Sequence, residues 1–323
     1  MVKNAVLLFP ADKKLVLNVT LAASSYVEFC CAPHTSFARS TWKFYGKRDP
    51  KRFGIEDRPT RTVNLSTRNG SLTFWKESKK CYGCVAASDS VEDLLQFLEH
   101  VANLFDGTTT KNLKISTERS CHLESIQSFN LLRKIRCVEI KKGTLDHNTM
   151  RRVLTGFEAK YLEFSCSVEA NFNFQDIPAF EDTVIIICAL FDNPMRLAYQ
   201  FDKLDMRSCE MPHKDVYDFL RHWKDSYNRV PQIIILYRNT YERESDGIYD
   251  SKWTRRKNWE QDQWNPTQID QFLREILELE PIRIKTGGSE IWNFKRITDG
   301  MMLRVWANTT GNYSEMDIRT WYE

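Results

Sequence analysis

The sequence predicts an α/β fold in which short, mainly parallel strands alternate with helices as irregular, leucine-rich-repeat-like units. Three observations lead to this prediction. Residues 201–236 fit a strand–helix–strand pattern. Pairs of apolar residues that resemble its first strand recur upstream, roughly two dozen residues apart, which is a typical length for such a repeat. Both ends of the chain alternate like β-strands instead. We therefore divide the chain into a β-rich region over 1–86, a repeat-like region over 87–285 and a C-terminal β-hairpin over 286–323 that packs on the sheet.

The strand–helix–strand segment is the strongest single pattern. Leu204 and Met206 point to one side of its first strand, while Asp205 and Arg207 point to the other. Pro212 suits the first turn of the helix, where no N–H group is needed. The apolar positions that follow at helical spacing are Val216, Phe219, Leu220 and Trp223. A crossover of this kind joins two parallel strands.

The same pattern recurs less completely along the chain. Residues 135–145 repeat it, with Gly143 at the position that holds Asn or Cys in leucine-rich units. Shorter echoes are Leu113/Ile115, Leu162/Phe164, Val184/Ile186, Ile233/Ile235 and Ile282/Ile284. An ordinary open α/β sheet would also show strands alternating with helices, so that alternative stays open.

The N-terminal region alternates with a period of two. Residues 15–21 are typical of a strand, and Asn69-Gly70 predicts a hairpin between two further strands. The basic, aromatic segment Thr35–Arg61 predicts a loop or bent strand whose rings cap the core. Stacking of these rings on nucleic-acid bases is the alternative.

Helices and a second hairpin follow from local signals. Residues 88–105 have one apolar face, and shorter helices are expected over 123–132, over 148–157 with Asp146 near its start, and over 266–279. Asp299-Gly300 predicts a hairpin between residues 291–297 and 301–307.

Catalytic and cofactor motifs are missing from the sequence. It has no Gly-rich phosphate loop, no nucleophile elbow and no zinc-protease motif. Its one C-x-x-C, Cys81 to Cys84, lacks a second close pair to complete a zinc site. We expect no enzyme activity, no cofactor and no metal.

Composition indicates a protein of the cell interior. No apolar run reaches the length of a membrane span, so we expect no membrane partner. The nine scattered cysteines, several in or beside expected strands, are typical of reduced, buried thiols. We expect a cytoplasmic protein, with the nucleus as the alternative. A net charge of only +3 gives no strong preference for polyanions.

The segment 237–264 breaks the strand–helix rhythm. It is polar and charged, yet it carries Trp253, Arg255, Arg256 and Trp259. Trp and Arg are enriched at the energetic centres of protein interfaces, so these four residues are candidates for partner binding. A solvated insertion whose tryptophans pack on the sheet edge is the alternative.

Strand alternation predicts a second candidate surface. If the strands align in parallel, the charged residues between the apolar pairs share one face that meets water. These residues are Lys114, Glu139, Lys141, Glu163, Asp205 and Arg207. A merely solvated face is the alternative. On the same face we expect Ile185 and Ile234 to be covered by the C-terminal hairpin, through Trp292, Phe294 or Trp306.

Two longer stretches resemble a known family. LDMRSCEMPHKDVYDFLRHWKDSYNRVPQIIIL and FKRITDGMMLRVW are similar to segments of the nematode-type F-box-associated domain, type 2. The matching elements are Leu204–Met206, Asp215–Trp223, Ile233–Leu236 and the R-x-x-D-G of Arg296–Gly300. The resemblance extends from about residue 60 onward.

The resemblance implies a protein-binding role. In proteins of this kind the domain is taken to bind the substrate of a cullin-type ubiquitin ligase, while an F-box docks on a Skp-like adaptor. An F-box is helical, and residues 1–50 here read as strands. We therefore expect a binding module for an unidentified protein that does not bind the Skp-like adaptor directly. A nucleic-acid-binding module that uses the Trp/Arg-rich insertion is the alternative.

Overall fold

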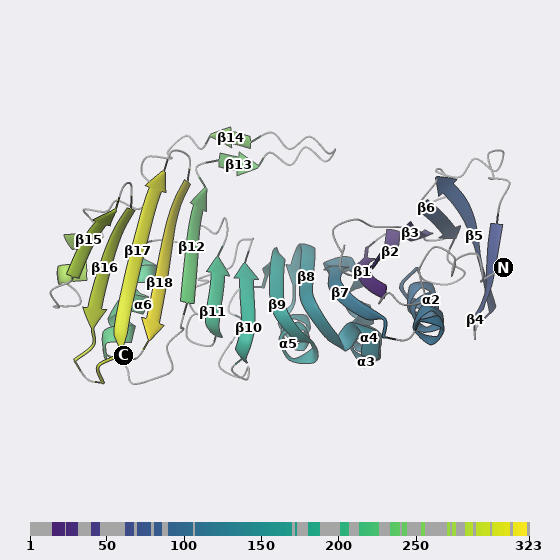
Figure 1. The fold of residues 1–323 in the computed structure, drawn as a ribbon, viewed down its shortest axis with the longest axis horizontal. Helices are drawn as coiled ribbons and strands as arrows, with labels where there is room; N and C mark the ends of the chain where they lie inside the picture. The colour runs from purple at the N-terminus through teal and green to yellow at the C-terminus, as the bar shows by residue number, and fades with distance from the viewer. Residues whose placement is uncertain are drawn as a thin grey trace. The chain divides into compact units, whose positions relative to one another are not determined.

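The computed structural model describes the strands, the helices and part of their connections (Figure 1). The described residues are 15–22, 24–31, 40–45, 62–67, 70–78, 81–85, 90–105, 107–169, 172, 180–187, 201–206, 213–225, 233–239, 241–243, 253–255, 270–271, 273–275, 282–286, 289–297, 299–310 and 313–321. The chain forms two compact units, Met1–Leu162 and Glu163–Glu323, and each is a mixed α/β structure.

The first unit begins with six strands, as the alternation of its sequence predicts. They are β1 (Leu15–Leu21), β2 (Ser24–Cys31), β3 (Ser40–Tyr45), β4 (Thr62–Thr67), β5 (Gly70–Ser78) and β6 (Cys81–Val85). Strands β4 and β5 form the hairpin predicted at Asn69-Gly70, with Thr67 paired to Gly70. The basic aromatic segment contributes β3, whose Trp42 and Phe44 are buried, so these two rings do cap the core.

Helices and parallel strands complete the first unit. In chain order they are α2 (Ser90–Leu104), β7 (Thr109–Ser116), the 3-10 helix η3 (Thr117–His122), α3 (Leu123–Ser128), α4 (Asn130–Arg133), β8 (Lys134–Leu145) and α5 (His147–Gly156). The strand order is β8-β7-β1-β2-β3-β6-β5-β4, with β1, β7 and β8 parallel to one another. The helix predicted over 123–132 breaks at Phe129, whose backbone is extended with φ −87° and ψ 112°.

An aromatic cluster forms the core beneath α2. Phe97 of α2 contacts the rings of Phe29, Trp42, Phe44 and Phe74, with centroids 5.1 to 5.9 Å apart. Rings at these spacings bury a large apolar area and add favourable edge and offset contacts. The helix is thereby fixed against β2, β3 and β5.

The second unit follows strand β9 (Glu158–Val168), which contains the boundary. Its elements are β10 (Phe180–Ile187), β11 (Phe201–Met206), α6 (His213–Asp225), β12 (Ile233–Asn239), β13 (Tyr241–Arg243), β14 (Trp253–Arg255), β15 (Ile282–Thr286), β16 (Ser289–Lys295), β17 (Met302–Thr310) and β18 (Tyr313–Trp321). The main strands follow the order β15-β16-β17-β18-β12-β11-β10, and β13 pairs with β14. Within 266–279, residues 270–271 and 273–275 are described and are helical.

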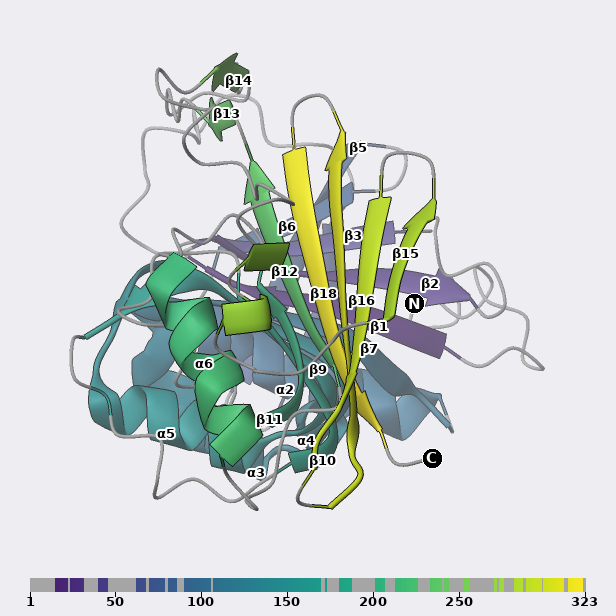
Figure 2. The same cartoon turned by 90° about the vertical axis from the view of Figure 1, so that its left-hand side faces the viewer.

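The predicted strand–helix–strand unit is confirmed. Strands β11 and β12 are parallel, with Leu204 opposite Ile234. Helix α6 lies on one face of this sheet, behind β17 and β18 in Figure 1 and to the left of the strands in Figure 2. Leu204, Met206, Phe219 and Trp223 are all at most 1% exposed, as expected for a strand packed beneath an amphipathic helix.

The C-terminal strands differ from the prediction. They do not pack on the sheet but extend it, because β18 pairs antiparallel with β12, and β17 and β16 follow at its other edge. The hairpin at Asp299-Gly300 is confirmed as the connection of β16 and β17. The Ile282/Ile284 echo is not a further parallel unit, since β15 runs antiparallel to β16.

The sequence analysis also assigns the residues of two strands, β10 and β12, to the wrong faces of the sheet. Ile185 pairs with Leu204, and so does Ile234, so both positions belong to the α6 side and not to the side of Asp205. Ile185 is buried, but the described C-terminal strands extend the sheet beyond β12 and do not cover it. A one-residue change of phase moves every residue of a strand to the opposite face, and strands that are apolar throughout give no alternation to fix it.

Candidate protein-binding surface

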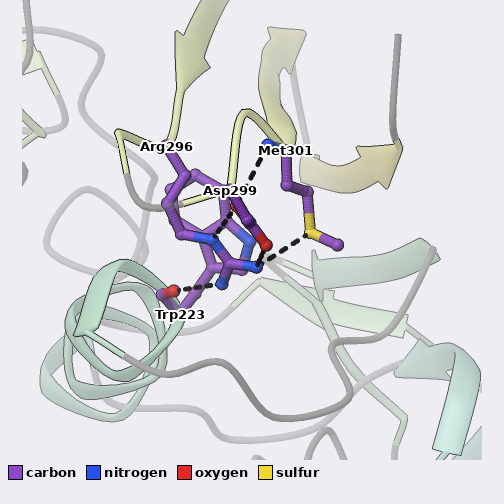
Figure 3. Close-up of polar contacts among 4 residues, drawn as sticks. All are labelled: Trp223, Arg296, Asp299 and Met301. Atoms are coloured by element: carbon purple, nitrogen blue, oxygen red, sulfur yellow. Dashed lines mark hydrogen bonds and ion pairs between the residues drawn. The ribbon is translucent and has the colours of Figure 1, made fainter.

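A buried arginine joins the β16–β17 connection to helix α6 (Figure 3). Arg296 is 2% exposed, and its Nη1 donates a hydrogen bond of 2.7 Å to the backbone carbonyl of Trp223. Its Nε donates to Asp299 Oδ1 at 2.8 Å, and its Nη2 donates to Asp299 Oδ2. The guanidinium also lies over the Trp223 ring, 5.2 Å from the centroid. One planar donor pair to Asp299, a further hydrogen bond to the Trp223 carbonyl and an aromatic face therefore compensate the burial of this charge.

The same contacts complete the end of helix α6. Trp223 lies in its last turn, where backbone carbonyls have no partner within the helix. A cation at this end is favourable because the helix dipole is negative there. Asp299 Oδ1 also accepts from the Met301 amide at 3.1 Å, and the Gly300 amide donates to the Arg296 carbonyl at 3.0 Å. We call these four residues, Trp223, Arg296, Asp299 and Met301, the arginine latch.

The arginine latch holds the sheet against α6, which lies on one of its faces. The opposite face carries a different set of side chains. Residues paired across neighbouring strands point to the same side of a sheet. One row contains Lys203, Arg319, Arg304 and Asn293, in β11, β18, β17 and β16. The next row contains Asp205, Asp317, Trp306 and Ile291. Together with Trp321 and Lys295 beyond the first row, we call these positions the open face.

Burial separates the two sides of the sheet. On the α6 side, Leu204, Trp292, Val305 and Ile318 are at most 1% exposed. On the open face, Lys295, Arg304 and Arg319 are exposed, whereas Trp306 and Trp321 are half-buried. The open face is therefore accessible to a partner and holds large side chains on rigid strands.

Polar contacts position the arginines of the open face. Arg319 binds the carboxylate of Asp317, with its Nε 2.9 Å from Oδ2 and 3.0 Å from Oδ1. These hydrogen bonds raise the pKa of Arg319 above its ordinary value. Arg304 donates from Nε to Asn293 Oδ1 at 2.9 Å, and its guanidinium lies 5.3 Å from the centre of the Trp321 ring.

The residues predicted from sequence in the first unit form a compact ion cluster. Lys114 and Glu139 are register partners on β7 and β8, and their charged groups are 3.0 Å apart. Lys141 lies 2.8 Å from the other oxygen of Glu139. Because Glu139 is buried and engaged by both lysines, it offers little unsatisfied charge to a partner. These three residues are brought together, but they are a weaker candidate than the open face.

The other predicted site residues fall in several places. Glu163 is half-buried on β9, and Asp205 is buried at 8% exposure on the open face. The backbones of Trp253 and Arg255 form β14, which pairs with β13. Arg207, Arg256 and Trp259 lie outside the described residues, as do the side chains of Trp253 and Arg255.

Sequence reasoning did not identify the cluster of Arg304, Trp306, Arg319 and Trp321. The signal is partial, because alternation of apolar and polar residues is limited to 303–305 and 316–319. The sequence predicts a hairpin between residues 291–297 and 301–307 in a β-rich tail, but it does not predict β18 as a separate third strand. Without β18, the two arginines and two tryptophans are not on neighbouring strands.

Two further observations concern metal binding and thiol reactivity in the described residues. Across the described residues, no group of three or more His, Cys, Asp or Glu side chains could hold a metal ion. Burial raises the pKa of the Cys166 thiol to about 12, which leaves it protonated and unreactive near neutral pH. None of the helices that the structure describes is long and apolar enough to cross a membrane.

Comparison with family models, curated proteins and solved structures gave no match.

Proposed function

We propose that the chain is a non-enzymatic protein-binding module, similar to the substrate-recognition part of an F-box adaptor of a cullin-type ubiquitin ligase. The observation that carries the proposal is the open face of the second unit. It places Arg304, Arg319, Trp306 and Trp321 on rigid, adjacent strands. Arginine and tryptophan dominate the energetic centres of protein interfaces.

The latch supports the proposal through its position in the sequence. Arg296, Asp299 and Gly300 are the R-x-x-D-G residues that resemble the F-box-associated family. Together with Trp223, they hold β16 and β17 against α6. A scaffold fixed in this way limits the entropy that an interface loses when a partner binds.

We further infer that the strand–helix units are of the leucine-rich type. Support comes from the parallel pairs β7–β8 and β11–β12, each joined by a connection that contains helix. The antiparallel β15 marks the end of this pattern.

Single-stranded nucleic acid is the second candidate partner, because Trp306 is half-buried and Trp321 already stacks against a guanidinium. Aromatic rings on a sheet can receive bases. A salt titration separates the two functions, since phosphate contacts give an affinity that falls steeply with salt.

The test of the protein-binding function is affinity purification from native cells with the wild-type chain and two matched variants. Trp306→Ala removes a half-buried ring from the open face. Tyr161→Ala removes a half-buried ring in the first unit that also lies near an arginine, Arg136, at 6.0 Å. Quantitative mass spectrometry records the recovered proteins, including ubiquitin-ligase subunits.

We expect partner proteins that the wild type and Tyr161→Ala retain and that Trp306→Ala loses. Circular dichroism of each variant shows whether it is folded. Partners lost only with Tyr161→Ala would move the binding surface to the first unit. Recovery that is equal for all three folded proteins would contradict a role for the open face.

A further inference from the structure

Two arginines face each other directly across the strands β17 and β18. Arg304 and Arg319 are register partners, so their side chains leave the same face from neighbouring positions. Like charges in directly opposed positions destabilise a sheet. Such a pair is favourable when an anion lies between the two guanidinium groups, since each can donate planar, paired hydrogen bonds.

Among the described side chains of this face, only one of these two charges has an acidic partner. Arg319 is bound by Asp317. Arg304 contacts an amide and an aromatic ring, and among the described residues no carboxylate pairs with it. The contacts with Asn293 and Trp321 orient its guanidinium without neutralising it.

The described side chains that are exposed on this face are positively charged. The arginines and Lys295 are exposed, whereas the carboxylates Asp205 and Asp317 are only 8% and 7% exposed. Among side chains that the structure describes here, the accessible charge is therefore cationic. Trp306, in the row beside the arginines, adds an apolar surface next to this charge.

From this arrangement we propose that the open face binds an acidic segment of a partner protein, with a carboxylate between Arg304 and Arg319 and an apolar side chain against Trp306. The inference rests on the protein-binding function proposed above and adds the chemistry of the partner. A nucleic-acid strand fits less well, because its phosphates repeat at every nucleotide, whereas the exposed cations described on this face are Lys295, Arg304 and Arg319.

The test is selection from a random 12-residue peptide display library against the purified full chain. Four variants accompany the wild type. Trp306→Ala removes a half-buried ring of the open face. Arg304→Glu reverses the charge, Arg304→Lys retains it, and Arg136→Glu reverses a matched exposed arginine that lies over Tyr161 in the first unit. The most enriched peptide is then synthesised with a fluorescent label and titrated by anisotropy. A labelled oligo-dT of 12 nucleotides is titrated in parallel.

We expect enrichment of Asp or Glu beside aliphatic or aromatic residues. The selected peptide should bind Arg304→Glu about tenfold more weakly or worse, and Arg304→Lys with an intermediate affinity. Arg136→Glu should bind it like the wild type. This combination supports the inference.

The contrary outcomes are distinct. Enriched peptides that lack acidic residues, yet lose binding with Trp306→Ala, would overturn the acidic partner and leave the protein-binding face intact. Peptides that bind all variants equally, or no enrichment at all, would overturn a peptide site on this face. Oligo-dT that binds more tightly than any peptide and loses affinity with Arg304→Glu would replace the protein partner by nucleic acid.

Discussion

The arginine latch shows how one buried charge can connect two elements. A guanidinium that is 2% exposed would be strongly unfavourable without partners. Here its donors reach a carboxylate and a helix-end carbonyl at once, and its face lies over an indole ring. Only arginine combines a planar donor fork with stacking, so the position depends on this residue type and not on charge alone.

The latch predicts a large stability loss from a conservative change. In Arg296→Lys, one ammonium group cannot replace both Asp299 contacts and the bond to the Trp223 carbonyl. We expect the free energy of unfolding to fall by about 3–5 kcal/mol, as for a broken buried pair. Urea denaturation followed by tryptophan fluorescence measures it. Arg304→Lys, at an exposed position on the next strand, should change the value by no more than about 0.5 kcal/mol. Equal effects of the two variants would contradict the latch.

A second residue-scale constraint lies at the end of β8. Gly143 has φ +67°, and a Cβ built there would lie 2.3 Å from Thr117 Oγ1. That hydroxyl is itself held by a 2.7 Å hydrogen bond to the Lys142 carbonyl, so it cannot move without losing this bond. The site has the small residue because both the backbone conformation and the space require it.

Gly107, in the same unit, provides a matched control for a substitution of Gly143. Gly107 also has a positive φ, +71°, but no atom lies within 4 Å of its added Cβ. We expect Gly107→Ala to cost about 1 kcal/mol from backbone strain. Gly143→Ala should cost a further 1 kcal/mol or more because it also displaces Thr117. Thermal unfolding of the two variants, measured side by side, gives the difference. Equal melting temperatures would show that Thr117 moves without cost.

At the scale of elements, helix α5 illustrates a start signal that sequence reveals well. Asp146 precedes it, and its Oδ1 accepts from the Thr149 amide at 2.9 Å. The Thr149 hydroxyl also donates to Oδ2 at 2.6 Å. These bonds stabilise the ionised carboxylate and lower the pKa of Asp146 below 3.8.

The lowered pKa gives the capping contribution a defined pH dependence. Its folded-state value lies below the unfolded one, so the stabilisation is present above about pH 4 and is lost as pH falls through the folded pKa. We expect Asp146→Ala to cost about 0.5–2 kcal/mol at pH 7, and Asp146→Asn, which can still cap, much less. Urea denaturation from pH 7 toward pH 3 should show the difference between wild type and Asp146→Ala shrinking. A constant difference would exclude the ionised cap.

The elements also show where sequence reasoning succeeds and where it does not. Helix α6 and the hairpin at Asp299-Gly300 follow from local spacing and turn residues, which act within a few positions. Strand β10 is apolar at Val184, Ile185 and Ile186, so its phase depends on pairing with β11 and not on its own pattern. Strand β18 was missed, and with it the antiparallel contact to β12 that places the open face.

For the molecule as a whole, the candidate site depends on pairing between distant segments. Asp205 lies on the face opposite Leu204, as alternation within β11 predicts, but it is only 8% exposed, so the expectation that it meets water is wrong. Asp317 and Trp306, in the same row, are more than a hundred residues away in sequence. Strand β12 lies between Asp205 and Asp317, and β12 and β18 lie between Asp205 and Trp306. No local pattern encodes that adjacency, so the sequence analysis places its candidate surfaces mainly on other residues.

The final prediction concerns the link between the whole chain and a ubiquitin ligase. Among the described N-terminal residues, 15–21, 24–31 and 40–45 are strands, and their apolar side chains are buried beneath α2 or beside β7. A Skp-like adaptor is expected to bind the exposed apolar surface of helices, which these strands do not offer. We expect no binding tighter than about 100 μM in isothermal titration of the purified chain with the adaptor. An F-box protein known to bind the same adaptor preparation is the positive control. A micromolar or tighter complex would contradict this prediction and would mean that another surface of the chain binds the adaptor. Trp306→Ala would then show whether that surface is the open face.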